Sequence, residues 1–452
     1  MGKSYGRRAI FTPESEVGMI IIDSIAEILN SHSALSAWQI RRTASRSNQL
    51  YLIGHDTESK RSVETDRFTI NVFVEREIEG KKVMGESECL YIPGEDLKTK
   101  IEQSAAMAAL VVNEPFTLPE AGQEYEQPET VDPEIKERPG DVISRIKDDI
   151  FSAVDSEKGL CLSAAEIYAS HQEITLLNSR GLRVEREETE IYVEFVLLAG
   201  RDGCEDVEAG TACRSRFYNN LRIGDTIKDY AGYACDSLTA KLPPTGKFDV
   251  VFSGEALDTL FNWFTVQAGG VASYQRWSKF EEGIPVVENP EGERLTLISN
   301  PLLAGGMRTR SFDVQGLPLR RLEVIKDGIF QSRTASKRYA DYLGIPPVGD
   351  FANVEVAPGV MPKDEIFQGG PILHLCRFST FEPNGITGAF SGEIRSGWLI
   401  DKGKRTPVKG GAVTGTIQEA FKRAYFSKEI VQREAYKGPA YVKLCGLDIG
   451  GE

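Results

Sequence analysis

The residues of this 452-residue chain that could perform chemistry include two carboxylates and an amide beside a short predicted strand. The stretch VVFSGEALDTLFNWF (residues 250–264) predicts a buried strand followed by an amphipathic helix that carries Glu255, Asp258 and Asn262. Carboxylates can act as general bases or metal ligands, but this helix contains neither histidine nor cysteine. The pattern predicts a well-formed helix at a candidate site with no zinc-binding pair on it.

The four histidines of the chain belong to no HExxH motif: they are His32, His55, His171 and His374. In ILHLC, His374 and Cys376 would share one face of a strand and could act as two metal ligands. With no third ligand nearby in the sequence, a core strand with a hydrogen-bonded histidine is the simpler interpretation. There is also no GxSxG elbow and no phosphate loop. A cysteine–histidine site assembled from distant residues stays open.

Composition favours a reduced, intracellular protein with little affinity for nucleic acid. The formal net charge is −14, which would repel a phosphate backbone. The seven cysteines are scattered and never form a CxxC pair, as is usual for thiols in a cytoplasm. No apolar stretch is long enough to span a bilayer. We therefore expect a cytoplasmic protein without direct contacts to nucleic acid or membrane.

The chain is expected to be an α+β protein with three folded regions. Residues 1–112 predict an N-terminal α+β domain, in which Phe68, Ile70, Val72 and Val74 share a strand face and a helix covers about 95–112. Residues 113–140 are acidic and proline-rich, which predicts a linker. Residues 141–242 predict a middle α+β module. Because SVETDRFTINVFV and RVEREETEIYVEF match weakly, duplication of a strand–strand–helix unit is one interpretation.

Residues 243–452 form a glycine-rich region with mostly strand and turn signals. Its glycines are interleaved with apolar residues at strand spacing, namely Phe390, Ile394, Trp398 and Ile400. Glycine at that density indicates tight turns and close backbone approach. We expect a large, mostly antiparallel β domain with few helices.

The same region resembles the TldD/TldE (PmbA) family, the "modulator of DNA gyrase" family of metalloprotease components. The resemblance rests on an ordered set of segments: FDVVFSGEALDTLF, NPLLAGGMRTRSFDVQGLPLRRLEVIKDGIF, TASKRYADYLG, NGITGAFSGEIRSGWLIDKGKRTPVKGGAVTGT and VKLCGLDIGG. It extends in order over most of the chain and is weakest in residues 1–60 and in the linker.

In that family the TldD-type subunit carries HExxxH on the helix after the strand that corresponds to DVVF. The resemblance places Asn262, Trp263 and Gln267 near its first histidine, its glutamate and its second histidine. The family's third zinc ligand is a cysteine shortly before the last strand, whereas VQREAYKGPAYVKL has none and Cys445 lies within that strand. This departure implies a TldE-type chain with no catalytic or metal residues of its own.

The resemblance implies a non-catalytic subunit of a cytosolic zinc-metalloprotease complex that processes peptides or small unfolded proteins and indirectly modulates gyrase poisons. Zinc is expected in a TldD-like HExxxH partner, with no cofactor in this chain and a homodimer when the chain is alone. A stand-alone hydrolase with a spatially assembled site that holds a metal at His374 and Cys376 is one alternative. A regulatory binding protein is another. The candidate substrate-channel or interface residues are Asn262, Gln267, Gly388, Phe390, Ser391 and Gly392.

Overall fold

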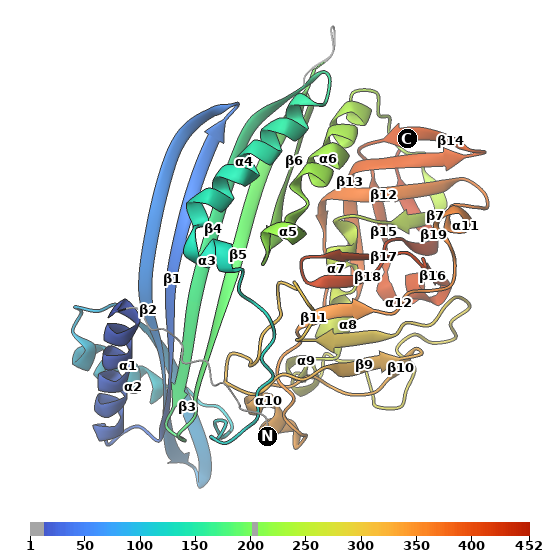
Figure 1. The fold of residues 1–452 in the computed structure, drawn as a ribbon. Helices are drawn as coiled ribbons and strands as arrows, with labels where there is room; N and C mark the ends of the chain where they lie inside the picture. The colour runs from blue at the N-terminus through green and yellow to red at the C-terminus, as the bar shows by residue number, and fades with distance from the viewer. Residues whose placement is uncertain (1–12, 201–206) are drawn as a thin grey trace, which may run out of the picture. The chain divides into compact units, whose positions relative to one another are not determined.

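The computed structural model describes residues 13–200 and 207–452, whose elements group into two units. Unit 1 consists of the residues up to Arg46, Glu64–Gln123 and Gln172–Glu187, and unit 2 of Ser47–Val63, Glu124–His171 and Glu188–Glu452. Strands β1, β2, β4 and β5 contribute residues to both units (Figure 1). No helix in the described part of the chain is both long enough and apolar enough to cross a membrane.

Unit 1 is built on one apolar core between helices and strands. Its elements are α1 (Pro13–Ser31), β3 (Lys81–Tyr91), α2 (Leu97–Ala108) and parts of β1 (Ala37–Ile53), β2 (Asp56–Ile78), β4 (Leu160–Asn178) and β5 (Arg183–Ala199). The alternation predicted in β2 is confirmed, since Phe68, Ile70 and Val72 are fully buried. Helix α2 is shorter than predicted, because the Asp96 side chain caps its first turn and the helical residues end at Ala108.

The first part of unit 2 packs two amphipathic helices against a sheet. The long elements are α4 (Pro139–Asp155), β4 (Leu160–Asn178), β5 (Arg183–Ala199), β6 (Val207–Ser215) and α6 (Ile223–Ser237), with short helices α3 (Pro133–Glu137) and α5 (Tyr218–Leu221). In α4 the buried residues Ile143, Ile146, Ile150 and Val154 recur at three- and four-residue steps. They share a core with Val193, Phe195 and Leu197 of β5.

The element order helix, three strands, helix occurs twice, first from α1 to α2 and then from α4 to α6. The full strand order of the six-stranded sheet is β3-β2-β1-β4-β5-β6. Strand β2 is the middle strand of the first three, and β5 is the middle strand of the last three. The residues matched between the two segments, Ile70 with Ile191 and Val72 with Val193, are all fully buried. This repeated order agrees with the interpretation of a duplicated unit.

The rest of unit 2 holds two further sheets. One has the order β10-β9-β8-β11-β18-β17, with strands β8 (Leu297–Asn300), β9 (Leu322–Lys326), β10 (Ile329–Phe330), β11 (Asn353–Val356), β17 (Ile430–Arg433) and β18 (Tyr436–Pro439). The other has the order β12-β7-β19-β15-β13-β14, with β7 (Gly246–Phe252), β12 (Ile372–Phe381), β13 (Ala389–Asp401), β14 (Lys404–Val408), β15 (Ala412–Thr416) and β19 (Val442–Gly450).

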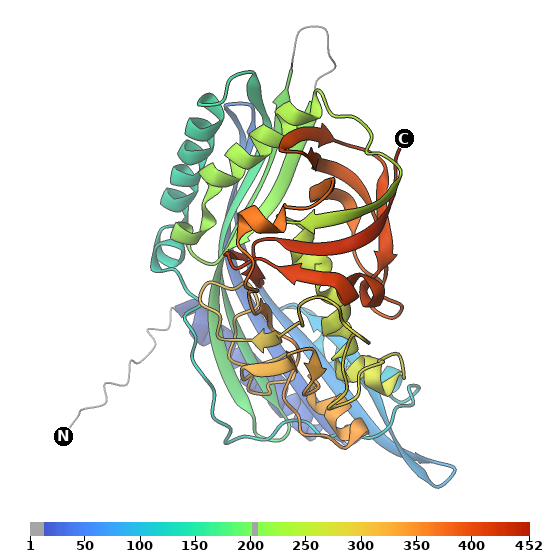
Figure 2. The same cartoon turned by 90° about the vertical axis from the view of Figure 1, so that its right-hand side faces the viewer.

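The second of these sheets closes on itself, because β12 pairs with β13 as well as with β7. Its pairings are antiparallel except β12 with β7, and β16 (Ala424–Phe426) joins β19 (Figures 1 and 2). Closure removes exposed strand edges around the ring. The expected mixed α+β fold with mostly antiparallel sheets and few helices is confirmed.

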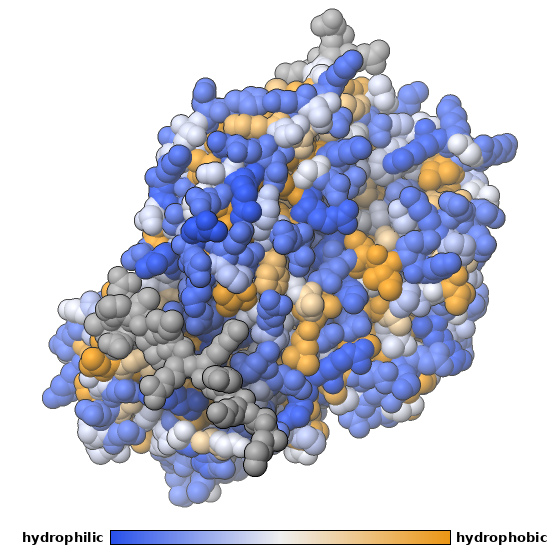
Figure 3. Space-filling view, in the orientation of Figure 1, coloured by the Kyte–Doolittle hydropathy of each residue, from blue (hydrophilic) through white to orange (hydrophobic). Residues whose placement is uncertain are grey.

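Short helices lie in the segments that connect these strands: α7 (Ala256–Leu260), α8 (Asn262–Gln267), α9 (Gly270–Tyr274), α10 (Lys337–Leu343), α11 (Lys363–Ile366) and α12 (Ile417–Ala420), followed by the 3-10 turn η1 (Phe421–Arg423). On the face drawn in Figure 3, hydrophilic side chains dominate and hydrophobic ones form separate patches. The candidate residues identified at 250–264 lie in unit 2, in β7 and the helices that follow it.

Candidate functional site

The helical segment after β7 is two short helices and not the single helix that was predicted. Strand β7 ends at Phe252, Gly254 turns the chain with φ of +61°, and α7 and α8 are separated by Phe261. A left-handed turn of this kind favours glycine. Leu257, Leu260 and Phe264 are buried in the large core of this region, so packing fixes the position of both helices.

The helix α8 holds the three positions where the family resemblance implies a zinc motif. Asn262 is half-buried at the start of α8, whereas Trp263 and Gln267 are fully buried. The Trp263 ring packs edge-on against Phe264 and Phe280, with centroids 5.0 and 5.3 Å away. Its indole nitrogen has no hydrogen-bond partner among residues 13–200 and 207–452. Trp263 therefore acts as a core residue.

Gln267 is a tether between three segments. Its side-chain Nε2 donates to the carbonyl of Gly385 at 2.7 Å, and its Oε1 accepts from the backbone N–H of Lys279 at 2.7 Å. The Gln267 carbonyl in turn accepts from Ser278 Oγ at 2.6 Å and from the Arg333 guanidinium at 3.1 Å. Because both ends of the amide are engaged, this side chain holds the loop at 385 against α8.

The loop at 384–388 is folded tightly against the same helix. The Asn384 side chain accepts from the backbone N–H groups of Ile386 and Thr387, at 3.1 and 2.9 Å. Gly388 is buried with φ of +76°, and a Cβ placed there would lie 3.2 Å from Trp263 Nε1. The glycine is thus required both by backbone conformation and by close approach.

The remaining candidate residues alternate across β13. Phe390 is buried and packs edge-on against Phe381 at 5.6 Å, and Gly392 is buried opposite Phe381 in the register of β12 and β13. A Cβ at Gly392 would lie 2.8 Å from Phe378 and 2.9 Å from Phe381. Ser391 lies on the other face and is exposed. Of the six predicted site residues, Ser391 and the half-buried Asn262 reach the surface of the chain.

His374 and Cys376, on β12, are each engaged in hydrogen bonds. The His374 Nε2 lies 2.7 Å from Ser253 Oγ, and its ring is surrounded by Phe367, Trp398 and Tyr441. Burial, followed by the charges of Arg405 and Lys363, lowers the pKa of His374 to about 3. An imidazole held neutral in this way is a weak base for activating Ser253.

Cys376 is fully buried, and its Sγ donates to the carbonyl of Ser396 at 3.2 Å. Burial raises the pKa of this thiol to about 12. A thiol at that pKa is an unreactive structural group, because the thiolate is the nucleophile and the metal ligand. The strand interpretation of ILHLC therefore fits the geometry better than a pair of metal ligands.

A charged cluster surrounds the first turn after β7. Glu255 accepts from Thr211 Oγ1 at 2.7 Å and from the Tyr230 hydroxyl, and its second oxygen lies 3.8 Å from Arg377 Nε. Burial is the main cause that raises the pKa of Tyr230, so its phenol stays protonated and donates. Sequence reasoning singled out Glu255, but no spacing rule connects it to partners on β6, α6 and β12.

Asp258, one turn further on, pairs with Arg433 of β17 at 3.2 Å. Burial raises the pKa of Asp258, and the opposing charge of Arg433 lowers it. About one third of the surface of each side chain is exposed to solvent. The two carboxylates that could have served chemistry are therefore used to hold α7 to neighbouring strands.

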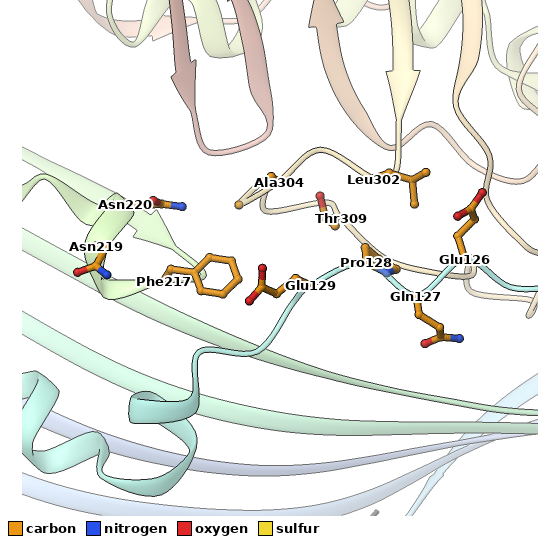
Figure 4. A pocket seen from close by; sticks show the side chains of 11 residues that line it. Glu126, Gln127, Pro128, Glu129, Phe217, Asn219, Asn220, Leu302, Ala304 and Thr309 are labelled. Carbon is orange, nitrogen blue, oxygen red and sulfur yellow. The ribbon is translucent and has the colours of Figure 1, made fainter. Parts of the chain in front are cut away.

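A separate polar pocket of about 470 Å³ lies between residues 126–129, the start of α5 and the loop after β8. Figure 4 shows the Glu129 carboxylate near the Phe217 ring, with Asn219 and Asn220 to the left of them. Its lining holds two carboxylates and two asparagine amides but no histidine, cysteine, lysine or arginine. These groups and the Gln127 amide can form hydrogen bonds to a ligand, and the lining holds no histidine or lysine that could activate the Thr309 hydroxyl.

The donor chemistry at the expected zinc positions does not fit a zinc ligand set, which uses imidazole, thiolate or carboxylate groups. Those positions carry an amide, an indole and a second amide, and the last is saturated by hydrogen bonds. Within the described residues, no three histidine, cysteine, aspartate or glutamate side chains are grouped so that they could hold a metal ion.

Comparison with known proteins identifies the C-terminal region. Residues 245–451 match the family model of the PmbA/TldA metallopeptidase C-terminal domain. The resemblance predicted from the segments of this region is thereby confirmed.

Three curated relatives match at low identity. A metalloprotease of Methanothermobacter thermautotrophicus is 23% identical over 54% of this chain and 58% of its own length. The metalloprotease PmbA of Escherichia coli O157:H7 is 20% identical over 60% and 61%. An uncharacterised protein of Methanocaldococcus jannaschii is 24% identical over 59% and 64%. The chain thus spans about three fifths of the length of these curated relatives.

Solved structures match over nearly the whole chain. TldE from Thermococcus kodakarensis has a TM-score of 0.80 at 18% identity, covering 96% of this chain and all of that one. A candidate modulator of DNA gyrase from Bacteroides thetaiotaomicron has a TM-score of 0.79 at 18% identity, covering 98% of this chain and all of that one. At these identities the comparison establishes a shared fold.

Proposed function

We propose that this chain, whose residues 245–451 form a PmbA/TldA metallopeptidase C-terminal domain, is the non-catalytic subunit of a zinc-metalloprotease complex of the TldD/TldE type. The zinc would be held by an HExxxH partner, and the pair would process peptides or small unfolded proteins in the cytoplasm. Modulation of gyrase poisons would follow indirectly from that proteolysis. Contacts with nucleic acid or membrane are not part of the proposal.

The observation that carries the proposal is the use of α8. In the register of the resemblance, its positions for the zinc ligands and the general base hold Asn262, Trp263 and Gln267. Trp263 and Gln267 are fully buried and packed or hydrogen-bonded inside the chain. Zinc catalysis needs three protein ligands, an open fourth position and a base. The side chains of Trp263 and Gln267 instead stabilise the packing of this helix.

The alternative of a stand-alone hydrolase has less support. It depends on His374 and Cys376. The first is a neutral, half-buried imidazole hydrogen-bonded to Ser253, and the second is a protonated, buried thiol hydrogen-bonded to a carbonyl. A regulatory binding protein would share the same geometry and differ only in its partner. The experiment has to separate these possibilities.

The test uses the purified chain alone and together with an HExxxH chain encoded by the same genome. Alone, the chain should be a homodimer by light scattering, contain far less than one zinc by elemental analysis and leave unstructured peptides uncut. With the partner it should form a stable complex that contains zinc and cleaves peptides. About one zinc in the isolated chain, lost in His374→Ala, would favour the stand-alone hydrolase. A partner that neither binds nor gains activity would favour the regulatory protein.

A matched pair of variants tests whether the exposed face of β13 borders the shared substrate space. Bulky changes at Gly388 or Gly392 are unsuitable, because their Cβ atoms would collide with the core. Ser391→Trp places bulk on the exposed face instead. It should reduce peptide cleavage by the pair at least about tenfold while zinc content and complex formation are kept. Lys428→Trp, at another exposed position, should cleave normally. Equal cleavage by both variants would place the substrate elsewhere.

A further inference from the structure

A second cavity, of about 1020 Å³, lies in unit 2 between the β5–β6 strands and the closed sheet. Its lining is polar and carries charges of both signs. Glu194 and Glu208 line it from β5 and β6, and Arg377, Arg395 and Lys409 line it from β12, β13 and the turn after β14. Three cations concentrated in one cavity are notable in a chain of net charge −14.

Arg377 lines this cavity and is largely buried, with 15% of its side chain exposed. It donates to the carbonyl of Gly210 at 2.8 Å and packs over the Tyr230 ring at 4.5 Å. Its Nε has no hydrogen-bond partner in the described part of the chain, and Glu255 lies 3.8 Å away. The guanidinium is therefore held in place with part of its hydrogen-bonding capacity unused.

The two other cations are available to a ligand. Arg395 donates to Ser379 Oγ at 3.3 Å and lies 3.6 Å from Glu393, yet almost half of its side chain is exposed. Lys409 forms no ion pair with any residue within 13–200 or 207–452. Carboxylates bind well to cations of this kind when the site is partly shielded from solvent.

The opposite wall provides backbone hydrogen-bonding groups. Strand β6 ends its sheet, and the Gly210 carbonyl points away from β5, since Arg377 binds it there. The two-residue period of a strand directs the backbone groups of Glu208 and Ala212 the same way, and both residues line the cavity. The carboxylates of Glu194 and Glu208 can accept N–H groups.

We propose that this cavity binds an acidic segment of an extended peptide. Carboxylates of the peptide pair with Arg395 and Lys409, and Arg377 adds a third positive charge to the same lining. The peptide backbone bonds to Glu208, Ala212 and the Glu194 carboxylate on the other wall. A polyanion such as nucleic acid fits less well, because it is charged at every residue and would place phosphates beside the two glutamates, whereas a peptide can place uncharged backbone N–H groups there. The inference deepens the proposed peptide-processing function, on which it rests for the class of ligand.

The test measures binding to the full chain alone by fluorescence anisotropy. Three labelled, unstructured decapeptides differ only in four positions, occupied by Glu, Gln or Lys. The Glu peptide should bind at least about fivefold more tightly than the Gln peptide at low salt, and the Lys peptide should bind most weakly. In Arg395→Gln/Lys409→Gln, affinity for the Glu peptide should fall about fivefold or more, towards that of the Gln peptide.

The control variant Lys404→Gln/Lys428→Gln removes the same charge at two exposed positions outside the cavity lining. It should keep most of the affinity for the Glu peptide. Equal losses in both double variants would mean that net charge alone attracts the peptide and would overturn the proposal. A single-stranded oligonucleotide that binds more tightly than the Glu peptide, and needs Arg395 and Lys409, would overturn it as well.

A photo-crosslinking version of the Glu peptide locates the site independently of affinity. Crosslinks should map to β6, β12 or β13, and crosslinks confined to other elements would refute the assignment. No partner chain is present in these measurements. Failure of the reconstituted pair to cleave peptides would therefore refute the proposed function and leave the cavity assignment standing, and the reverse also holds.

Discussion

Replacing Gln267 with methionine removes hydrogen bonds while leaving the volume of the side chain nearly unchanged. The variant Gln267→Met would leave the Gly385 carbonyl and the Lys279 N–H without their partners at 2.7 Å. Each buried backbone group left unpaired costs about 1–3 kcal/mol. Both bonds are only partly shielded from solvent, so we expect a total loss in the free energy of unfolding of about 2–4 kcal/mol.

The assay combines global and local measurements, because a chain with two units need not unfold in one step. Urea unfolding followed by the combined fluorescence of the four tryptophans reports the global loss of stability. Hydrogen exchange followed by mass spectrometry reports the Lys279 amide, which should exchange faster once its acceptor is gone. The loop at 384–388 should lose protection as well, because Gln267 no longer holds it to α8.

The matched control is Gln418→Met, which removes only a long, exposed hydrogen bond of 3.4 Å to Lys279 Nζ. Its effect should lie within about 0.5 kcal/mol. If Gln267→Met were as mild as this control, with exchange at Lys279 unchanged, the tethering role of Gln267 would be refuted. The explanation for glutamine at that position would then fail too.

Two further predictions concern stability and accessibility. Burial, followed by the charge of Asp350, raises the pKa of Asp313 from 3.8 to about 7. Because the unfolded chain ionises this carboxyl at lower pH than the folded chain does, the free energy of unfolding falls as the pH rises from about 4 to 7. Asp313→Asn should therefore be more stable than the parent chain at pH 8, on the order of 1–3 kcal/mol, with no gain at pH 4; equal stability at pH 8 by urea unfolding would contradict this. A glutamate-specific protease should cut first within 113–140, at exposed residues such as Glu120 or Glu126, and early fragments from 250–264 or 386–416 would contradict the linker interpretation.

Much of the fold could be predicted from periodicity. The two-residue alternation of Phe68, Ile70 and Val72 placed one face of β2 in a core, as the burial of these residues confirms. The turn at 178–181 is formed by the turn-favouring residues NSRG, and the Asn178 side chain accepts from the N–H groups of Arg180 and Leu182 there. These features depend on a few neighbouring residues, so the sequence contains all the information they need.

Helix ends were less predictable. One helix was expected after β7, but the chain forms α7 and α8 with Phe261 between them. The break depends on how Phe261 packs against Tyr436 and Phe421, which belong to distant segments. Tertiary packing thus overrides the local preference for a continuous helix.

The sequence by itself determined what the candidate site lacks, since no histidine or cysteine is present at Asn262, Trp263 and Gln267 and the ordered segments of residues 245–451 indicate the family. Only the tertiary structure decided how those positions are used: Gln267 reaches Gly385 and Lys279, and Glu255 meets Thr211, Tyr230 and Arg377. The physical reason is that residue identity and periodicity are local properties of a chain. Hydrogen bonds and ion pairs between distant segments depend on how sheets and helices pack, which no local pattern records.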